Sequence, residues 1–162
     1  MPSPVRVLFV CLGNICRSPA AEGVFRHLVH EEGLAEALHI DSAGTADWHS
    51  GKLPDERMRQ AGKARGYDFS SRARQARAED LQKFDLILAM DAQNHRDLLS
   101  LDPQGLHHTK IRLFRDFCTA HETGDVPDPY YGGPEGFENV LDLLEDGCAG
   151  VLSHARGLLS RS

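Results

Sequence analysis

Apolar residues along the chain form short runs that alternate with longer stretches of helical spacing. The short runs are apolar, and the first is rich in β-branched residues, which is typical of buried strands. We therefore predict strands at 5–10, 38–42, 84–90 and 110–114. The longer stretches repeat apolar residues at intervals of three and four, which predicts amphipathic helices. These helices are expected at 20–32, 55–64, 92–101 and 137–159.

This alternation of strands and helices predicts an α/β fold. Strands that alternate with helices form parallel sheets through right-handed crossovers. We expect a Rossmann-like, four-stranded parallel sheet with helices on both faces. With no repeat and no linker in sight, residues 1–162 are expected to form a single domain. Ligands of such sheets bind beyond the carboxyl ends of the strands, so the segments that follow each strand are the first place to look for a site.

Composition narrows the class of protein. Of the 162 residues, 41% are apolar and 26% are charged, as in ordinary soluble globular proteins. The net charge of −6 argues against a nucleic-acid or anionic-membrane partner. No apolar run approaches the ~18 residues of a membrane span, and no signal peptide is recognised. Four cysteines in a chain of this length do not form a disulfide scaffold, so a reducing cytoplasm is expected.

The segment after the first strand has the features of an anion site. The residues from Cys11 to Arg17 form a tight loop, and we expect Ser18 to cap the next helix with Pro19 as its first residue. A loop that leads from a strand into a helix N-terminus gathers backbone N–H groups and the positive end of the helix dipole. The sequence therefore predicts a phosphate loop after the first strand.

Each residue type in this loop has a physical reason to be there. Gly13 allows a close approach of the backbone to a ligand, and Asn14 tolerates a left-handed conformation. Arg17 carries a planar fork that matches two phosphate oxygens. Cys11, beside a guanidinium and a helix N-terminus, is favoured as a thiolate and is placed to attack phosphorus. Ser18 is positioned to donate a hydrogen bond to that sulfur.

A metal centre is the competing interpretation of these cysteines. Cys11 and Cys16 would have to share a metal with His27 and His30, which lie along a helix that leads away from the loop. That spacing disfavours a closed ligand sphere. We therefore expect no metal and no cofactor.

Two motifs identify a family. The stretch from Val7 to Pro19, VLFVCLGNICRSP, resembles the signature of the low-molecular-weight protein tyrosine phosphatases, which carry Cys-x5-Arg-Ser near the N-terminus. The family also carries an Asp-Pro acid motif near its C-terminus, and this chain has Asp128-Pro129-Tyr130-Tyr131-Gly132. The resemblance covers essentially the whole chain and implies a cysteine-dependent phosphatase that hydrolyses phosphotyrosine through a phosphocysteine.

The resemblance also implies roles for single residues. Cys11, Arg17 and Asp128 are the expected catalytic residues, as nucleophile, anion clamp and general acid. A turn former or an ion-pair partner is the alternative for Asp128. Substrate binding is expected from Leu12, Gly13, Asn14, Ile15, Cys16, Ser18, Trp48, Tyr130 and Tyr131.

Two further residues are implied as support for the loop. Ser42 is expected to brace Asn14, although a simple turn residue is the alternative. Asp91 is expected to cap a helix and to join the network of hydrogen bonds behind the loop. The family usually carries a histidine where this chain has Ser71, so a histidine bond in that network is not expected here.

The same fold also supports different functions. Arginine phosphatases of the family usually carry threonine at the position of Ile15, and arsenate reductases need two further cysteines close together. A non-catalytic phosphate-binding module would need neither Cys11 nor Asp128. The expected partners are a phosphotyrosine protein, a cognate tyrosine kinase, and phosphate, vanadate or another oxyanion in the site.

Cys16 lies close to Cys11 in the loop, so a redox role is expected. A thiolate is the sulfur most prone to oxidation to sulfenic acid, and a neighbouring thiol can capture that species as a disulfide. The resemblance favours this protective role for Cys16. Packing beneath the loop is the alternative.

Overall fold

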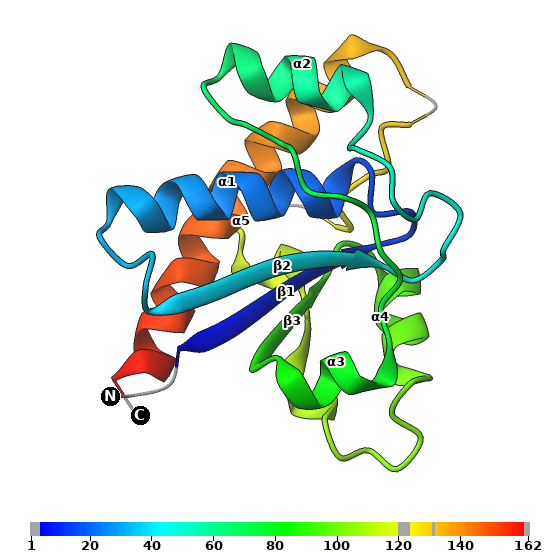
Figure 1. The fold of residues 1–162 in the computed structure, drawn as a ribbon, viewed down its shortest axis with the longest axis vertical. Helices are drawn as coiled ribbons and strands as arrows, with labels where there is room; N and C mark the ends of the chain where they lie inside the picture. Colours follow the sequence, from blue (N-terminus) through cyan, green and yellow to red (C-terminus); the bar gives the residue numbers. More distant parts are fainter. Residues whose placement is uncertain (1–3, 120–123, 131, 161–162) are drawn as a thin grey trace.

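The computed structural model describes residues 4–119, 124–130 and 132–160. These residues form a parallel sheet with helices on both faces, as predicted (Figure 1). In the described part of the chain, none of the helices is both long and apolar enough to cross a bilayer.

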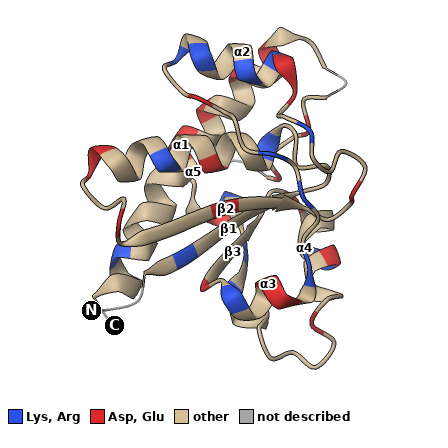
Figure 2. Cartoon of the chain, viewed as in Figure 1, with Lys and Arg blue, Asp and Glu red and all other residues tan. Residues whose placement is uncertain are grey.

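The four strands of the described sheet lie in the order β2-β1-β3-β4. β1 (Val5–Cys11) lies between β2 (Leu38–Gly44) and β3 (Leu86–Ala89) and is parallel to both. β4 (Ile111–Leu113) completes the edge beside β3. Each strand carries at most one Lys, Arg, Asp or Glu, so the ribbon of the sheet is nearly free of charge in Figure 2. This is the pattern of a sheet that is buried on both faces.

The helices divide between the two faces. One core cluster joins alternate residues of β1, among them Val7 and Phe9, to α1 and α5, and the other joins Leu8 and Val10 to α3 and α4. The α-helices are α1 (Arg17–Glu31), α2 (Glu56–Ala64), α3 (Ala78–Lys83), α4 (Ala92–Leu99) and α5 (Pro134–Leu159), with 3₁₀ turns η1 (His108–Lys110) and η2 (Phe114–Phe117).

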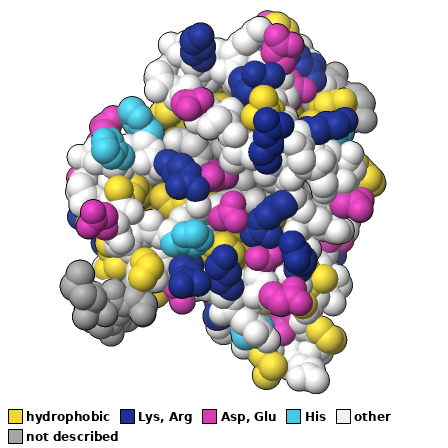
Figure 3. Space-filling model, in the orientation of Figure 1, with side chains coloured by type: hydrophobic (Ala, Val, Ile, Leu, Met, Phe, Trp, Pro, Cys, Tyr) yellow, Lys and Arg dark blue, Asp and Glu magenta, His cyan; other side chains and the backbone are white. Residues whose placement is uncertain are grey.

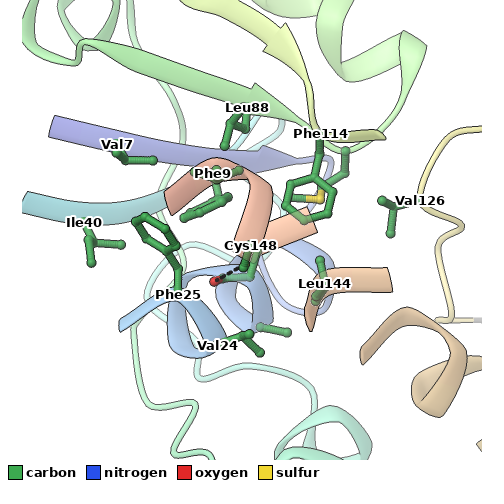
Figure 4. Packing of buried hydrophobic residues seen from close by; sticks show 14 of the residues in the cluster. Val7, Phe9, Val24, Phe25, Ile40, Leu88, Phe114, Val126, Leu144 and Cys148 are labelled. Atoms are coloured by element: carbon green, nitrogen blue, oxygen red, sulfur yellow. Dashed lines mark hydrogen bonds between the residues drawn. The ribbon is translucent and has the colours of Figure 1, made fainter. Parts of the chain in front are cut away.

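The centre of the larger core is an aromatic cluster around β1. The ring of Phe9 meets the ring of Phe25 from α1 edge to face, with 5.5 Å between centroids, and the ring of Phe114 at 6.3 Å (Figure 4). The thiol of Cys148 on α5 is fully buried beside them and donates to the carbonyl of Ala21 at 3.7 Å. This core anchors β1 firmly, and β1 carries the predicted phosphate loop at its end.

Charged side chains surround this core. Over the face drawn in Figure 3, Lys and Arg side chains are interspersed with Asp and Glu side chains. Attraction of an anion on this face therefore depends on the local arrangement of a few cations.

Several element boundaries differ from the prediction. The first helix begins at Arg17, with Cys16 at the N-cap position, so the expectation that Ser18 caps it was wrong. The Ser18 side chain is instead bonded behind the loop, as described below. The last helix begins at Pro134, because proline is favourable in the first turn.

The third and fourth strands are shorter than predicted, and their apolar ends continue into turns. The segment 84–90 forms a strand only over Leu86–Ala89, and residue 114 belongs to a 3₁₀ turn. The short helix α3 was not predicted. It lies in a polar segment where the apolar periodicity is too brief to detect.

Two glycines of α5 make a test of this packing. A Cβ atom at Gly150 would lie 2.1 Å from the carbonyl oxygen of Phe117, which is backbone, whereas a Cβ atom at Gly157 would meet no atom within 4 Å. Gly150→Ala should therefore lower the free energy of unfolding by about 1–3 kcal/mol, since overpacking displaces neighbouring groups. Gly157→Ala should raise it by up to about 0.5–1 kcal/mol, because alanine favours the helix.

Chemical denaturation of the two variants beside the wild type measures both changes. Equal effects of the two substitutions would contradict the close approach of α5 to η2.

Candidate active site

The candidate site lies at the carboxyl ends of the central strands. β1 ends at Cys11, β2 ends at Gly44, and Met90 and Asp91 follow the end of β3. The loop after β1 continues into α1, and its backbone is tied to β2's exit because Thr45 N donates to Cys11 O at 2.9 Å. The residues expected to support the loop, Ser42 and Asp91, both lie at this edge.

The backbone of the loop is arranged for an anion. The carbonyls of Leu12 and Ile15 are turned outward, where they accept from Ala46 N at 3.0 Å and Asp55 N at 2.7 Å. The backbone N–H groups of residues 13–17 donate to no acceptor within the described residues. Successive amides without a protein partner at a helix N-terminus form a cradle for an oxyanion.

Asn14 holds the shape of this cradle. It has φ of 56°, the left-handed conformation expected from the sequence. Its Nδ2 donates to Ser18 Oγ at 2.8 Å and to Ser42 Oγ at 3.0 Å, and its Oδ1 accepts from Arg74 N at 3.0 Å. The hydrogen bond implied between Ser42 and Asn14 is therefore present.

Behind Asn14 the network reaches a buried carboxylate. Ser42 Oγ donates to Glu22 Oε1 at 2.6 Å, and Glu22 accepts from Arg26 Nε at 2.9 Å. Glu22 is 4% exposed, and pairing with Arg26 offsets the cost of burying its charge. No sequence pattern singles out Glu22 for this network, because it is a single acidic residue on a helix.

The sulfur of Cys11 lies against Ser18. Sγ is 3.0 Å from Ser18 Oγ, and the backbone N–H of Ser18 points to the sulfur at 3.5 Å. Because Ser18 Oγ accepts from Asn14, its one proton has two acceptors, Ala43 O at 3.3 Å and Cys11 Sγ at 3.0 Å, and a thiolate at Cys11 favours the contact with the sulfur. The thiolate thus has two donors and the first turn of α1 beside it, which stabilise its negative charge.

Arg17 is buried with its guanidinium fixed on one side. Nη1 donates to Asp91 Oδ2 at 2.6 Å and to Val126 O at 3.1 Å, and Nη2 lies 3.6 Å from Asp128 Oδ2. Burial lowers the pKa of Arg17, but the charges of Cys11, Asp91 and Asp128 outweigh burial and raise it. Asp91 itself accepts from Asn94 N at 2.7 Å, as the expected cap of α4.

Asp128 is the most exposed member of this group. Its side chain is 40% exposed, and its Oδ1 accepts from Tyr130 N at 3.1 Å. The segment is tied to the sheet through Val126, whose N–H donates to Met90 O at 2.9 Å. Asp128 thus lies at the rim of the site, beside Arg17.

A cavity of about 250 Å³ joins these groups. Its walls include Trp48, which is 67% exposed, as well as His49 and Tyr130. The sequence pointed to Trp48 and Tyr130 but missed His49, whose position beside Trp48 in the same loop was the available signal. Tyr131 lies outside the described residues. The remaining lining comes from Cys11, Leu12, Gly13, Ile15, Cys16, Arg17 and Asp128.

Two residues expected at the substrate do not line the cavity. Asn14 is 3% exposed and Ser18 is fully buried, and both side chains bond to each other and to groups behind the loop. Asn14 keeps its expected place at the anion only through its backbone N–H, which belongs to the cradle. The two side chains brace the loop, because their hydrogen-bonding groups are already satisfied there.

Cys16 also lines the cavity, close to Cys11. Burial, followed by the negative charge of Asp55, raises the pKa of the Cys16 thiol far above its usual range. Cys16 is therefore a neutral thiol. Among the described residues, no group of three or more His, Cys, Asp or Glu side chains is arranged to hold a metal ion.

Comparison with known proteins agrees with this geometry. Residues 6–158 match the family model of the low molecular weight phosphotyrosine protein phosphatases. A low molecular weight protein-tyrosine-phosphatase of Streptomyces coelicolor is 44% identical over 93% of each chain. The crystal structure of a protein tyrosine phosphatase from Entamoeba histolytica, with Hepes in the active site, is 46% identical. It covers 94% of this chain and 97% of its own, with a TM-score of 0.91.

A second branch of function occurs among the similar structures. The Drosophila arginine phosphatase is 34% identical, covers 91% of this chain and 96% of its own, and has a TM-score of 0.85. Its identity to this chain is lower than that of the Streptomyces and Entamoeba tyrosine phosphatases described above. Since the family model spans nearly all of the sequence, the chain belongs to the low molecular weight phosphotyrosine protein phosphatases.

Proposed function

We propose that this protein-tyrosine phosphatase hydrolyses aryl phosphate esters through a phosphocysteine at Cys11. The observation that carries the proposal is the position of Cys11 Sγ, beside a loop whose amides at 13–17 have no acceptor within the described residues. A phosphoryl group in that cradle presents its phosphorus to the sulfur. The amides hold its oxygens as charge shifts during transfer.

Arg17 binds the phosphoryl oxygens, and Asp128 transfers protons. Nη1 of Arg17 is occupied by Asp91 and Val126, so Nη2, whose contact with Asp128 Oδ2 is the longer one at 3.6 Å, is the nitrogen that binds the phosphoryl oxygens. In the first step the Cys11–phosphorus bond forms, the phosphorus–oxygen bond breaks, and Asp128 protonates the leaving phenolate. In the second step Asp128 accepts a proton from water, which attacks phosphorus and displaces the sulfur.

Ser18 assists the departure of Cys11. A hydroxyl donor at 3.0 Å from the sulfur stabilises the thiolate that is released when the phosphocysteine is hydrolysed. This gives Ser18 a role behind the loop, in agreement with its burial.

The walls of the cavity favour an aromatic substrate. Trp48, His49 and Tyr130 surround the entrance, and Leu12 and Ile15 add apolar surface. A phenyl ring between these walls lets the phosphate reach Cys11, whereas the shorter side chain of phosphoserine would not span the same depth. Ile15 in place of threonine supports phosphotyrosine over phosphoarginine.

An arsenate reductase and a non-catalytic binding module fit these residues less well. Cys148 is fully buried in the core and Cys118 is partly buried, so neither fits the exposed, mobile cysteine pair of an arsenate reductase. A binding module has no use for a thiolate beside a carboxylic acid. We further propose a reducing cytoplasmic setting, in which the partners are phosphotyrosine proteins and a cognate tyrosine kinase.

Cys11→Ser tests the nucleophile. Hydrolysis of a phosphotyrosine peptide should fall by at least about 10⁴-fold, because an alcohol is a poor nucleophile at neutral pH. Binding of phosphate should persist, because the cradle is mostly backbone. Phosphate release and isothermal titration measure the two effects. Appreciable turnover by the variant would remove Cys11 from this role, and faster release from phosphoarginine by the wild type would assign the chain to the arginine branch.

Asp128→Ala tests the acid. The loss of kcat should be about 10²–10⁴-fold for phenyl phosphate and much smaller for p-nitrophenyl phosphate, whose leaving group needs little protonation. Steady-state rates with a series of substituted aryl phosphates measure this dependence. A loss of equal size across the series would give Asp128 a purely structural role.

Cys16→Ser tests the redox role of the neighbouring thiol. Peroxide should inactivate the wild type reversibly through a Cys11–Cys16 disulfide, and dithiothreitol should restore activity. The variant should keep its basal turnover and lose most of the recovery. Mass spectrometry of the oxidised protein detects the bond. Recovery that is unchanged in the variant would refute the protective role of Cys16.

A further inference from the structure

The segment that carries the acid is held at its far end by a residue of α2. Arg57 Nη2 donates to the carbonyl oxygen of Tyr130 at 2.9 Å. The Arg57 guanidinium lies 5.4 Å from the centroid of the Tyr130 ring and 4.8 Å from that of Phe137, near the start of α5. Figure 1 shows α2 beside the beginning of α5. Arg57 therefore contacts both the segment 128–130, here called the acid loop, and the helix that follows it.

Arg57 is itself fixed by Asp55. Its Nε donates to Asp55 Oδ1 at 3.1 Å and its Nη2 to Asp55 Oδ2 at 3.0 Å, so the planar fork is held on both oxygens. Partial burial raises the pKa of Asp55, but the hydrogen bonds from Arg57 outweigh burial and hold the pKa below its usual range. Asp55 also caps α2, since its Oδ1 accepts from Arg57 N at 2.8 Å.

The same residues touch the phosphate loop. Asp55 N donates to the carbonyl of Ile15 at 2.7 Å, one of the outward-facing carbonyls that leave the cradle amides unpaired. A continuous set of contacts thus runs from Ile15 through Asp55 and Arg57 to Tyr130. It joins the loop that holds the phosphate to the loop that holds the acid.

The position of Asp128 depends on both ends of its loop. Val126 ties the start of the segment to Met90, and Asp128 Oδ1 accepts from Tyr130 N at 3.1 Å. A shift of the backbone at Tyr130 therefore moves the carboxyl group of Asp128. Arg17 Nη2, at 3.6 Å, attracts the same carboxylate, so the position of Asp128 also depends on Arg17.

From these contacts we infer that Arg57 is a positioning residue for the general acid. It holds the acid loop at a fixed distance from the phosphate loop and so sets the reach of Asp128 to the leaving oxygen. The inference rests on the proposed role of Asp128. Arg57 does not line the cavity, so it acts on the reaction through the residues that it contacts, above all Tyr130.

Arg57→Gln removes the fork, and Arg57→Lys keeps the charge without the fork. Both should lower kcat for phenyl phosphate by about tenfold and change it less than about threefold for p-nitrophenyl phosphate, since a displaced acid matters most for a poor leaving group. Inhibition by vanadate should stay within about twofold of the wild type, because the cradle amides are untouched. Lys63→Gln, an exposed cation on the same helix, controls for the loss of charge and should match the wild type.

Steady-state rates for the aryl phosphate series are measured on the wild type, the three variants and Asp128→Ala, with thermal unfolding of each. A loss that is equal for both leaving groups, or full activity in Arg57→Lys, would overturn the inference. So would an equal loss in Lys63→Gln. If the loss of kcat in Asp128→Ala does not depend on the leaving group, the proposed role of Asp128 as the general acid is wrong. If Asp128→Ala shows that dependence and both Arg57 variants lack it, only the role of Arg57 fails.

Discussion

The left-handed turn at Asn14 is the constraint on which the site depends. A non-glycine residue in this conformation carries a cost, and it persists where the surroundings hold it. Here Ser18, Ser42 and the N–H of Arg74 satisfy the whole side-chain amide of Asn14. This turn directs the carbonyls of the loop outward and leaves its amides for a ligand. The same hydrogen bonds place Ser18 beside the sulfur of Cys11. The shape of the anion cradle and the position of the donor to the nucleophile therefore both depend on Asn14.

The sheet explains why distant segments meet around that turn. The carboxyl ends of β1, β2 and β3 bring Cys11, Ser42 and Asp91 to one edge, although they are far apart in the sequence. The acid loop follows β4 in the sequence, and Val126, just before the loop, donates to Met90 O. The segment is thus held by a backbone contact at Val126 and by a side-chain contact from Arg57 at Tyr130.

Most of the fold and the centre of the site could be predicted from local patterns in the sequence. Strand-loop-helix chemistry around Cys11, and the cap at Asp91, are readable because each depends on neighbours in sequence. Glu22, His49 and Arg57 were missed, since their partners Ser42, Tyr130 and Phe137 come from other elements and only the folded chain brings them together. The start of the first helix was placed wrongly for a similar reason. Ser18 has a side chain that suits a helix cap, but its hydroxyl group is in contact with Cys11 Sγ and accepts from Asn14 instead.

The bond between Arg17 and Asp91 has a consequence for inhibitors. Because Asp91 and Val126 already hold one nitrogen of the guanidinium, its orientation is set before any anion arrives, and little side-chain entropy is left to lose on binding. A compound gains affinity from this preorganisation only if its anionic group fits the fixed orientation of the Arg17 guanidinium. Compact tetrahedral or trigonal-bipyramidal heads should therefore bind more tightly than flexible or planar carboxylates of the same charge, and added affinity should come from aromatic groups that stack on Trp48 and Tyr130.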